Sequence, residues 1–218
     1  MPRKKALRKD AFFIQDQALG PGTRHTGSAS SFFPVEQPLT LELGCGKADF
    51  SRAMAAHYPS RNFIGIDLKP DRLWHASTKA AATGLTNVGF MCLNLLQIGD
   101  HFEKGEVAEA WITFPDPFPK NRQAKHRMVN PGFLRAYAQI LAPDSILHYK
   151  TDNLPLFQYS LEVFVKEPYL SMVDLTFDLH QADSPNPDAL FITDYEARFI
   201  EMGKTINYVA LSLDKTRL

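Results

Sequence analysis

The sequence contains few of the residues that mark secreted, membrane-spanning or metal-binding proteins. Its 218 residues include two cysteines, Cys45 and Cys92, which form neither a disulfide framework nor a metal-ligand spacing. The seven histidines likewise show no metal spacing. No apolar run approaches the roughly 20 residues that span a bilayer, and the basic N-terminus lacks the apolar region of a signal peptide. We therefore expect a cytoplasmic protein with no membrane partner and no metal.

An excess of charge of either sign is also absent. The chain has 24 Lys and Arg residues against 24 Asp and Glu residues, so no global charge signal points to nucleic acid. Local basic patches still decide such contacts. The length and the 44% hydrophobic content predict one globular domain with a substantial core, and they leave monomer and homodimer open.

Composition divides the chain into an N-terminal extension, residues 1–38, and a domain, residues 39–218. Lys and Arg crowd the start of the extension, and residues 20–34 are rich in Gly, Ser, Thr and Pro, so we expect a basic, flexible arm or tail. Short apolar runs then alternate with amphipathic stretches, which predicts an α/β fold with a mostly parallel sheet. The predicted strands are residues 39–43, 62–67, 88–94, 109–114, 145–150, 175–179 and 206–213, and the predicted helices are residues 49–57, 71–83, 133–141 and 156–164.

A glycine-rich turn follows the first predicted strand and leads into a helix. Gly44 and Gly46 let the backbone turn sharply and approach a ligand closely. A dinucleotide fingerprint would have a third glycine at position 49, with pyrophosphate at the helix N-terminus. Asp49 stands there instead, and Glu42 lies just upstream, so both would repel a pyrophosphate. These acids suit S-adenosylmethionine, which carries an amine and a sulfonium.

The next two predicted strands end in polar residues that suit a nucleoside. Asp67 ends its strand 21 residues after Gly46, a distance at which a carboxylate reaches the ribose hydroxyls of a cofactor lying across the sheet. The alternative is a solvated acid in a turn. Asn94 ends the third strand, where its amide could meet the adenine edge or serve a structural purpose.

Residues 114–120 read Phe-Pro-Asp-Pro-Phe-Pro-Lys and directly follow a predicted strand. Proline fixes its own φ, removes a backbone donor and keeps the preceding residue out of the helical region. The segment therefore predicts a stiff loop at the edge where open α/β sheets bind ligands. Such a loop would hold Asp116 at a nearly fixed position, and the alternative is a plain rigid turn.

Together with the glycine turn, three downstream motifs carry a family resemblance: residues 114–122, residues 150–157 and residues 193–196. In this order they resemble the bacterial tRNA (guanine-N7)-methyltransferase family of the TrmB type, over roughly residues 39–213. The resemblance implies a class I, Rossmann-like S-adenosylmethionine-dependent methyltransferase fold, with a seven-stranded, mostly parallel sheet and helices on both faces. It also implies methyl transfer to N7 of a guanine in the tRNA variable loop.

The resemblance further implies roles for single residues. S-adenosylmethionine contacts are implied for Glu42, Asp67, Asn94 and Asp116, beside the glycines Gly44 and Gly46. Asp116 is also implied as the central active-site residue. Substrate contacts are implied for Lys120, for Asp152 and for the stretch from Thr193 to Glu196.

Taken without the resemblance, the candidate RNA-contacting residues allow more than one interpretation. A basic run follows the proline-rich segment and consists of Lys120, Arg122, Lys125, His126 and Arg127. This run suits contacts with backbone phosphates, and the alternative is a solvated charged loop. Phe118 could stack on a base or belong to the core. The spacing of Thr193 and Glu196 also fits a helix capping box.

Two rival functions stay open at this point. The first is a methyltransferase acting on another RNA or on a small molecule. The second is a non-catalytic RNA-binding protein on a degenerate methyltransferase fold, because Asn94 stands where the family usually has an acid and Ala48 where it commonly has a glycine.

Overall fold

The computed structural model describes residues 18–19, 33–183 and 186–218. The predicted extension, residues 1–38, lies largely outside these residues, so its role as a basic arm stays a prediction. Phe33, near its end, is buried and packs in the core.

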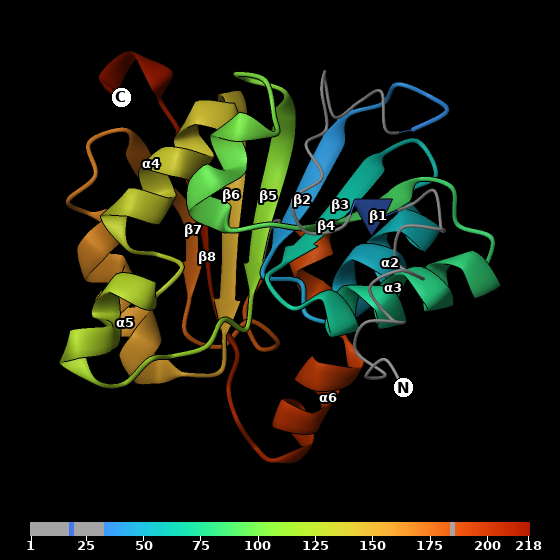
Figure 1. Cartoon of the computed structure of the whole chain (residues 1–218). Helices are drawn as coiled ribbons and strands as arrows, with labels where there is room; N and C mark the ends of the chain where they lie inside the picture. Colours follow the sequence, from blue (N-terminus) through green and yellow to red (C-terminus); the bar gives the residue numbers. More distant parts are fainter. Residues whose placement is uncertain (1–17, 20–32, 184–185) are drawn as a thin grey trace, which may run out of the picture.

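One sheet of eight strands runs through the molecule in the order β1-β4-β3-β2-β5-β6-β8-β7 (Figure 1). Neighbours from β1 to β6 in this order are parallel, whereas β8 is antiparallel to both β6 and β7. Seven strands form the predicted mostly parallel sheet, and the two-residue β1 extends it beside β4. The strands are β1 (Ala18–Leu19), β2 (Leu39–Leu43), β3 (Asn62–Asp67), β4 (Val88–Cys92), β5 (Val107–Thr113), β6 (Leu141–Thr151), β7 (Leu170–Thr176) and β8 (Asn207–Leu213).

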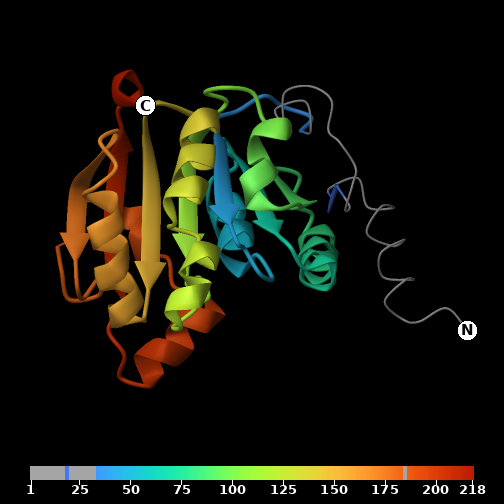
Figure 2. The same ribbon diagram turned by 60° about the vertical axis from the view of Figure 1, so that its left-hand side comes forward.

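Helices cover both faces of the sheet (Figure 2). Helices α2 and α3 share one apolar cluster with one face, and α4 and α5 share another with the opposite face. The α-helices are α2 (Asp49–His57), α3 (Pro70–Ala82), α4 (Pro131–Ile140), α5 (Leu154–Phe164) and α6 (Asp194–Glu201). The 3-10 helices are η2 (Leu95–Asp100), η3 (Asn121–His126), η4 (Pro187–Leu190) and η5 (Lys215–Arg217). None of the helices in the described ranges combines the length and the apolar character needed to cross a membrane.

Alternation along the strands separates packing residues from polar ones. In β2, Leu41 and Leu43 join the cluster of α4 and α5, while Glu42 between them hydrogen-bonds to Ser51 of α2. In β6, Tyr149 joins the cluster of α4 and α5, whereas Lys150 contacts the segment between β7 and β8. The polar side chains that matter below therefore lie on the α2 face.

The observed elements differ from the predicted ones mainly at the C-terminal end. Strands β2 and β3 and helix α2 begin and end at the predicted residues. The strand predicted at residues 175–179 is wrong, because β7 covers residues 170–176. It is an edge strand with largely exposed side chains, so hydrophobic alternation marks it poorly.

Candidate active site

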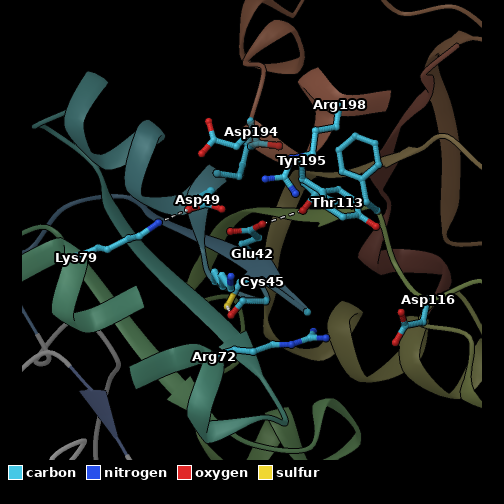
Figure 3. Close-up of a pocket in the computed structure, with 16 residues that line it drawn as sticks. Glu42, Cys45, Asp49, Arg72, Lys79, Thr113, Asp116, Asp194, Tyr195 and Arg198 are labelled. Carbon is cyan, nitrogen blue, oxygen red and sulfur yellow. Dashed lines mark hydrogen bonds and ion pairs between the residues drawn. The ribbon is translucent and has the colours of Figure 1, made fainter. Parts of the chain in front are cut away.

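A pocket of about 490 Å³ opens beside α6, at the carboxyl ends of the parallel strands (Figure 3). Four segments line it: the turn between β2 and α2, helix α3, the loop after β5, and the first turns of α6. Seven residues with predicted roles lie in its wall, namely Glu42, Gly44, Gly46, Asp116, Thr193, Asp194 and Tyr195. The pocket thus lies at the sheet edge where α/β proteins bind ligands.

Glu42 is the buried acid of this pocket. Its Oε2 accepts hydrogen bonds from the backbone N–H of Ser51 at 3.0 Å and from the Ser51 hydroxyl at 2.5 Å. Its Oε1 accepts a hydrogen bond from Thr113 Oγ1 at 2.8 Å (Figure 3). Burial raises the pKa of Glu42 to about 7, although these hydrogen bonds favour the ionised form. A cationic ligand beside it would also favour ionisation.

The glycine turn brings bare backbone to the pocket. Gly44 and Gly46 have φ values of 76° and 58°, in the left-handed region that glycine tolerates. A Cβ on Gly44 would lie 2.8 Å from Met128 Sδ, so a side chain there would require Met128 to shift, in addition to the strain of the positive φ. Ala48 is fully buried and has a φ of 52°. This left-handed conformation costs a residue with a Cβ about 1 kcal/mol. The turn keeps its shape even where alanine replaces the commoner glycine.

Asp67 fixes this turn from the neighbouring strand. Its Oδ2 accepts a hydrogen bond from the Gly46 N–H at 3.0 Å, and its Oδ1 accepts one from the Lys69 N–H at 2.7 Å. Arg72 Nη1 lies 3.5 Å from Oδ2, and Arg72 lines the pocket. The structure therefore joins Asp67 to the glycine turn, and its contact with a ribose stays a prediction.

The proline loop is irregular, as predicted, and it presents an exposed Asp116 to the pocket (Figure 3). Phe114 and Phe118 flank it with φ values of 49° and 43°, which non-glycine residues keep only where their surroundings hold them. Arg127 supplies part of that hold. Its Nε and Nη2 donate to the carbonyl oxygen of Phe118 at 3.3 and 3.0 Å, and its guanidinium lies 4.1 Å from the centre of the Tyr159 ring.

The predicted basic run divides into two parts. An exposed group on η3 and just before it comprises Lys120, Arg122, Lys125 and His126. Arg127 is the exception, since it contacts the proline loop instead of facing solvent. Phe118 is half-buried and packs against His126, with ring centres 5.7 Å apart.

Helix α6 begins at the capping residue that the sequence predicts. Thr193 Oγ1 accepts a hydrogen bond from the Glu196 N–H at 3.2 Å, so Thr193 caps the helix as the capping box predicts, whereas the Glu196 carboxylate bonds elsewhere. The Glu196 side chain turns inward and is fully buried. Its Oε2 accepts a hydrogen bond from Lys150 Nζ at 2.7 Å, and its Oε1 lies 2.9 Å from His180 Nε2. Glu196 is thus occupied by protein partners on both oxygens, and this geometry does not support the predicted direct substrate contact.

Asn94 and Asp152 lie outside the residues that line the pocket. Asn94 Oδ1 accepts a hydrogen bond from the Leu96 N–H at 3.1 Å and so caps η2. Asp152 Oδ2 lies 2.5 Å from Lys204 Nζ, and Lys204 lies over the ring of Phe199 on α6. Their contacts with adenine and with tRNA stay predictions.

Basic residues that the sequence does not single out also line the pocket, among them Arg72, Lys79 and Arg198 (Figure 3). Lys79 Nζ lies 3.6 Å from Asp49 Oδ1. Arg198 is exposed on α6, one turn beyond Thr193. Extending the capping motif by one helical turn would have found Arg198, whereas no local pattern marks the other two.

Comparison with known sequences identifies relatives along most of the chain. Residues 36–209 match a family model described as "Putative methyltransferase". A tRNA (guanine-N(7)-)-methyltransferase of Cytophaga hutchinsonii is 37% identical over 187 residues, which cover 85% of this chain and 84% of that protein. The enzyme of the same name from Staphylococcus aureus is 33% identical over 205 residues, 94% of each chain.

Comparison with solved structures gives the fold independently. The 16S rRNA methyltransferase KamB has a TM-score of 0.65 at 16% identity, and the match covers 91% of this chain and 99% of that one. A 16S rRNA (adenine(1408)-N(1))-methyltransferase from Catenulisporales acidiphilia, solved with its cosubstrate S-adenosylmethionine, has a TM-score of 0.61 at 14% identity and covers 87% and 90% of the two chains. These neighbours confirm the class I methyltransferase fold, and the sequence relatives show that this chain belongs to the tRNA (guanine-N(7)-)-methyltransferase family.

Proposed function

We propose that this protein transfers a methyl group from S-adenosylmethionine to N7 of a guanine in the variable loop of tRNA. The observation that carries the proposal is the single pocket in which the glycine turn, Glu42, Asp116 and the start of α6 meet. Membership of the tRNA (guanine-N(7)-)-methyltransferase family supplies the reaction. A cytoplasmic location and the oligomeric state stay predictions.

The lining of the pocket fits a nucleoside that carries positive charge. Its four acids, Glu42, Asp49, Asp116 and Asp194, are matched in number by Lys47, Arg72, Lys79 and Arg198. The acid next to the glycine turn, Glu42, is the one that suits an amine or a sulfonium. We assign the glycine turn and Glu42 to the methionine part of the cofactor, and Asp67 to its ribose. When bound, S-adenosylmethionine supplies an electrophilic methyl group on a sulfonium.

The reaction requires no general base from the protein. Guanine N7 has an accessible lone pair and no proton, so it can attack the methyl carbon directly. The task of the protein is then to hold the two reactants in line, an effect that can contribute roughly 7–11 kcal/mol in favourable cases. Stiff segments around the pocket suit this task better than mobile ones.

Asp116 is the group that we assign to the guanine. Its position on a loop with three prolines limits its movement. A carboxylate there can accept hydrogen bonds from the N1–H and the amino group of guanine. As the methyl group arrives, the purine gains positive charge, and a fixed carboxylate stabilises that charge. Asp116 would therefore act by positioning and by electrostatic stabilisation.

The exposed basic group beside the pocket is suited to bind phosphates of the tRNA backbone. Lys120 and Arg122 are exposed at the start of η3, directly after the proline loop. Cations there can contact phosphates next to the target nucleotide. Such contacts position the tRNA without reading its sequence.

Incubation with a tRNA transcript that lacks N7-methylguanosine tests the proposal. We expect methyl transfer from S-adenosylmethionine to one guanine of the variable loop, mapped by chemical cleavage at that base. A transcript with adenine at that position serves as the matched control and should accept no methyl group. Calorimetric titration that detects no S-adenosylmethionine binding, or methylation at another atom, would refute the proposal.

A further inference from the structure

One buried ammonium group connects the two walls of the pocket. Lys150, near the end of β6, has no exposed surface. Its Nζ donates hydrogen bonds to Glu196 Oε2 at 2.7 Å, to the Ala189 carbonyl oxygen at 2.8 Å and to the Phe191 carbonyl oxygen at 3.3 Å. All three acceptors belong to the segment between β7 and β8, so the three protons of one side chain fix three points of that segment.

The same lysine also contacts the wall that bears the active-site acid. Its backbone carbonyl oxygen accepts a hydrogen bond from the Phe114 N–H at 2.8 Å, and its Nζ lies 5.9 Å from the centre of the Phe114 ring. That ring packs against Tyr195 and Phe199 of α6, with centres 5.6 and 5.8 Å away. Lys150 therefore lies where the Asp116 loop meets α6.

The acid partner of Lys150 is equally enclosed. Glu196 has no exposed surface, and its second oxygen is held by His180 at 2.9 Å. A buried ion pair contributes little net stability compared with apolar side chains of the same size, because both charges lose their hydration. What such a pair does provide is a defined geometry, since each charge tolerates few other arrangements.

We propose that Lys150 and Glu196 form a positioning pair that fixes α6, and with it Tyr195 and Arg198, at the mouth of the pocket. Tyr195 is half-exposed and lines the pocket together with Arg198. These side chains then receive the tRNA nucleotide beside Asp116. The pair itself touches neither reactant. The inference rests on the proposed function, since it names how that site accepts tRNA.

A separate anchor keeps the rest of the segment in place. Asp188 of η4 accepts hydrogen bonds from the Tyr58 hydroxyl and from Arg61 Nη1, the latter at 3.2 Å. Loss of the Lys150–Glu196 pair should therefore release α6 and leave η4 attached to the body of the protein.

The double variant Lys150→Met/Glu196→Leu tests the pair, because it removes both charges and leaves neither one buried alone. We expect S-adenosylmethionine affinity within about threefold of the wild type and kcat/KM for tRNA lower by about 100-fold, the loss that a displacement of about 1 Å can cause. A kcat/KM within about threefold of the wild type, or an equal loss of cofactor affinity, would overturn the proposal. His148→Gln is the matched control: it perturbs a buried polar residue of β6 that bonds to Tyr208 in β8, and it should leave kcat/KM unchanged.

A thermodynamic cycle with Tyr195→Ala separates positioning from general loss of stability. If the pair acts through α6, Tyr195→Ala should lower kcat/KM in the wild type and have little further effect in the double variant. Additive effects would contradict the proposal. Should the double variant fail to fold, Glu196→Gln takes its place in the cycle under the same criterion.

Hydrogen exchange gives a readout that does not depend on activity. Amides of α6 should exchange faster in the double variant, while those of β6 and β8 keep their protection. Unchanged exchange in α6 would refute the positioning pair even if the wild type proved inactive on tRNA. Inactivity of the wild type alone would refute the proposed function instead.

Discussion

At the scale of single residues, Glu42 carries an ionisation that opposes folding. Its pKa in the folded protein is about 7, above the ordinary 4.5. Relative to Glu42→Gln, the free energy of unfolding of the wild type should therefore be highest below pH 4.5. It should fall as the pH rises to about 7, by about 3 kcal/mol in all. Urea unfolding of both proteins across this range measures the difference, and a difference independent of pH would contradict the raised pKa.

Asp116 should behave in the opposite way, with a large effect on turnover and a small one on stability. Asp116→Asn keeps the size of the side chain and removes the negative charge that, in our proposal, stabilises the positive charge on the purine. We expect kcat to fall by about 100-fold to 1,000-fold, as for the loss of other transition-state hydrogen bonds. Because Asp116 is exposed, Tm should change little. Near-normal turnover, measured as methyl incorporation under saturating tRNA, would exclude the proposed role.

At the scale of elements, the basic residues on and around η3 have two different tasks. Lys120 and Arg122 are assigned to tRNA phosphates, whereas Arg127 holds the proline loop. Arg127→Gln removes the contacts to the Phe118 carbonyl oxygen and to the Tyr159 ring. We expect a roughly tenfold lower kcat, since the loop that bears Asp116 becomes less fixed. The salt dependence of tRNA binding should stay unchanged, because the Arg127 guanidinium is already engaged by the Phe118 carbonyl oxygen and the Tyr159 ring. A flattened salt dependence would show that Arg127 binds the backbone instead.

Local motifs explain which elements could be predicted from the sequence. Alternating apolar residues and a glycine turn locate β2, α2 and β3 to the residue. Helix α6 was marked only by its cap, because Glu196 is its one fully buried residue and no apolar stripe is required. Likewise β7 lies at the sheet edge and shows little alternation. Packing against the core constrains the sequence of weakly buried elements least, so these elements are the hardest to predict.

The same reasoning separates the predictable part of the site from the rest. Glu42, Gly46 and Asp116 lie in short motifs whose chemistry is local. The contact between Lys150 and Glu196 joins positions 46 residues apart, and it depends on the path of the chain between β7 and β8. The family resemblance and the capping spacing therefore single out Glu196, and neither shows that its carboxylate faces inward.

At the scale of the whole molecule, a net charge of zero coexists with a proposed polyanionic substrate. Attraction to tRNA must then come from where cations are placed relative to the pocket. Lys120 and Arg122 follow the proline loop at the carboxyl edge of the sheet, whereas Lys104 precedes β5 at the opposite edge. All three are exposed, so their placement is what distinguishes them.

The salt dependence of tRNA binding can test that placement. Each phosphate contact contributes roughly 0.7–0.9 to the slope of log K against log salt. Lys120→Ala/Arg122→Ala should therefore reduce the slope by about 1.5 and weaken binding to all tRNAs alike. Lys104→Ala removes a comparable cation and should leave the slope as it is. If the slope flattened by the same amount per charge removed in both proteins, overall charge would govern binding, and the surface beside Asp116 would not be a specific tRNA-binding surface.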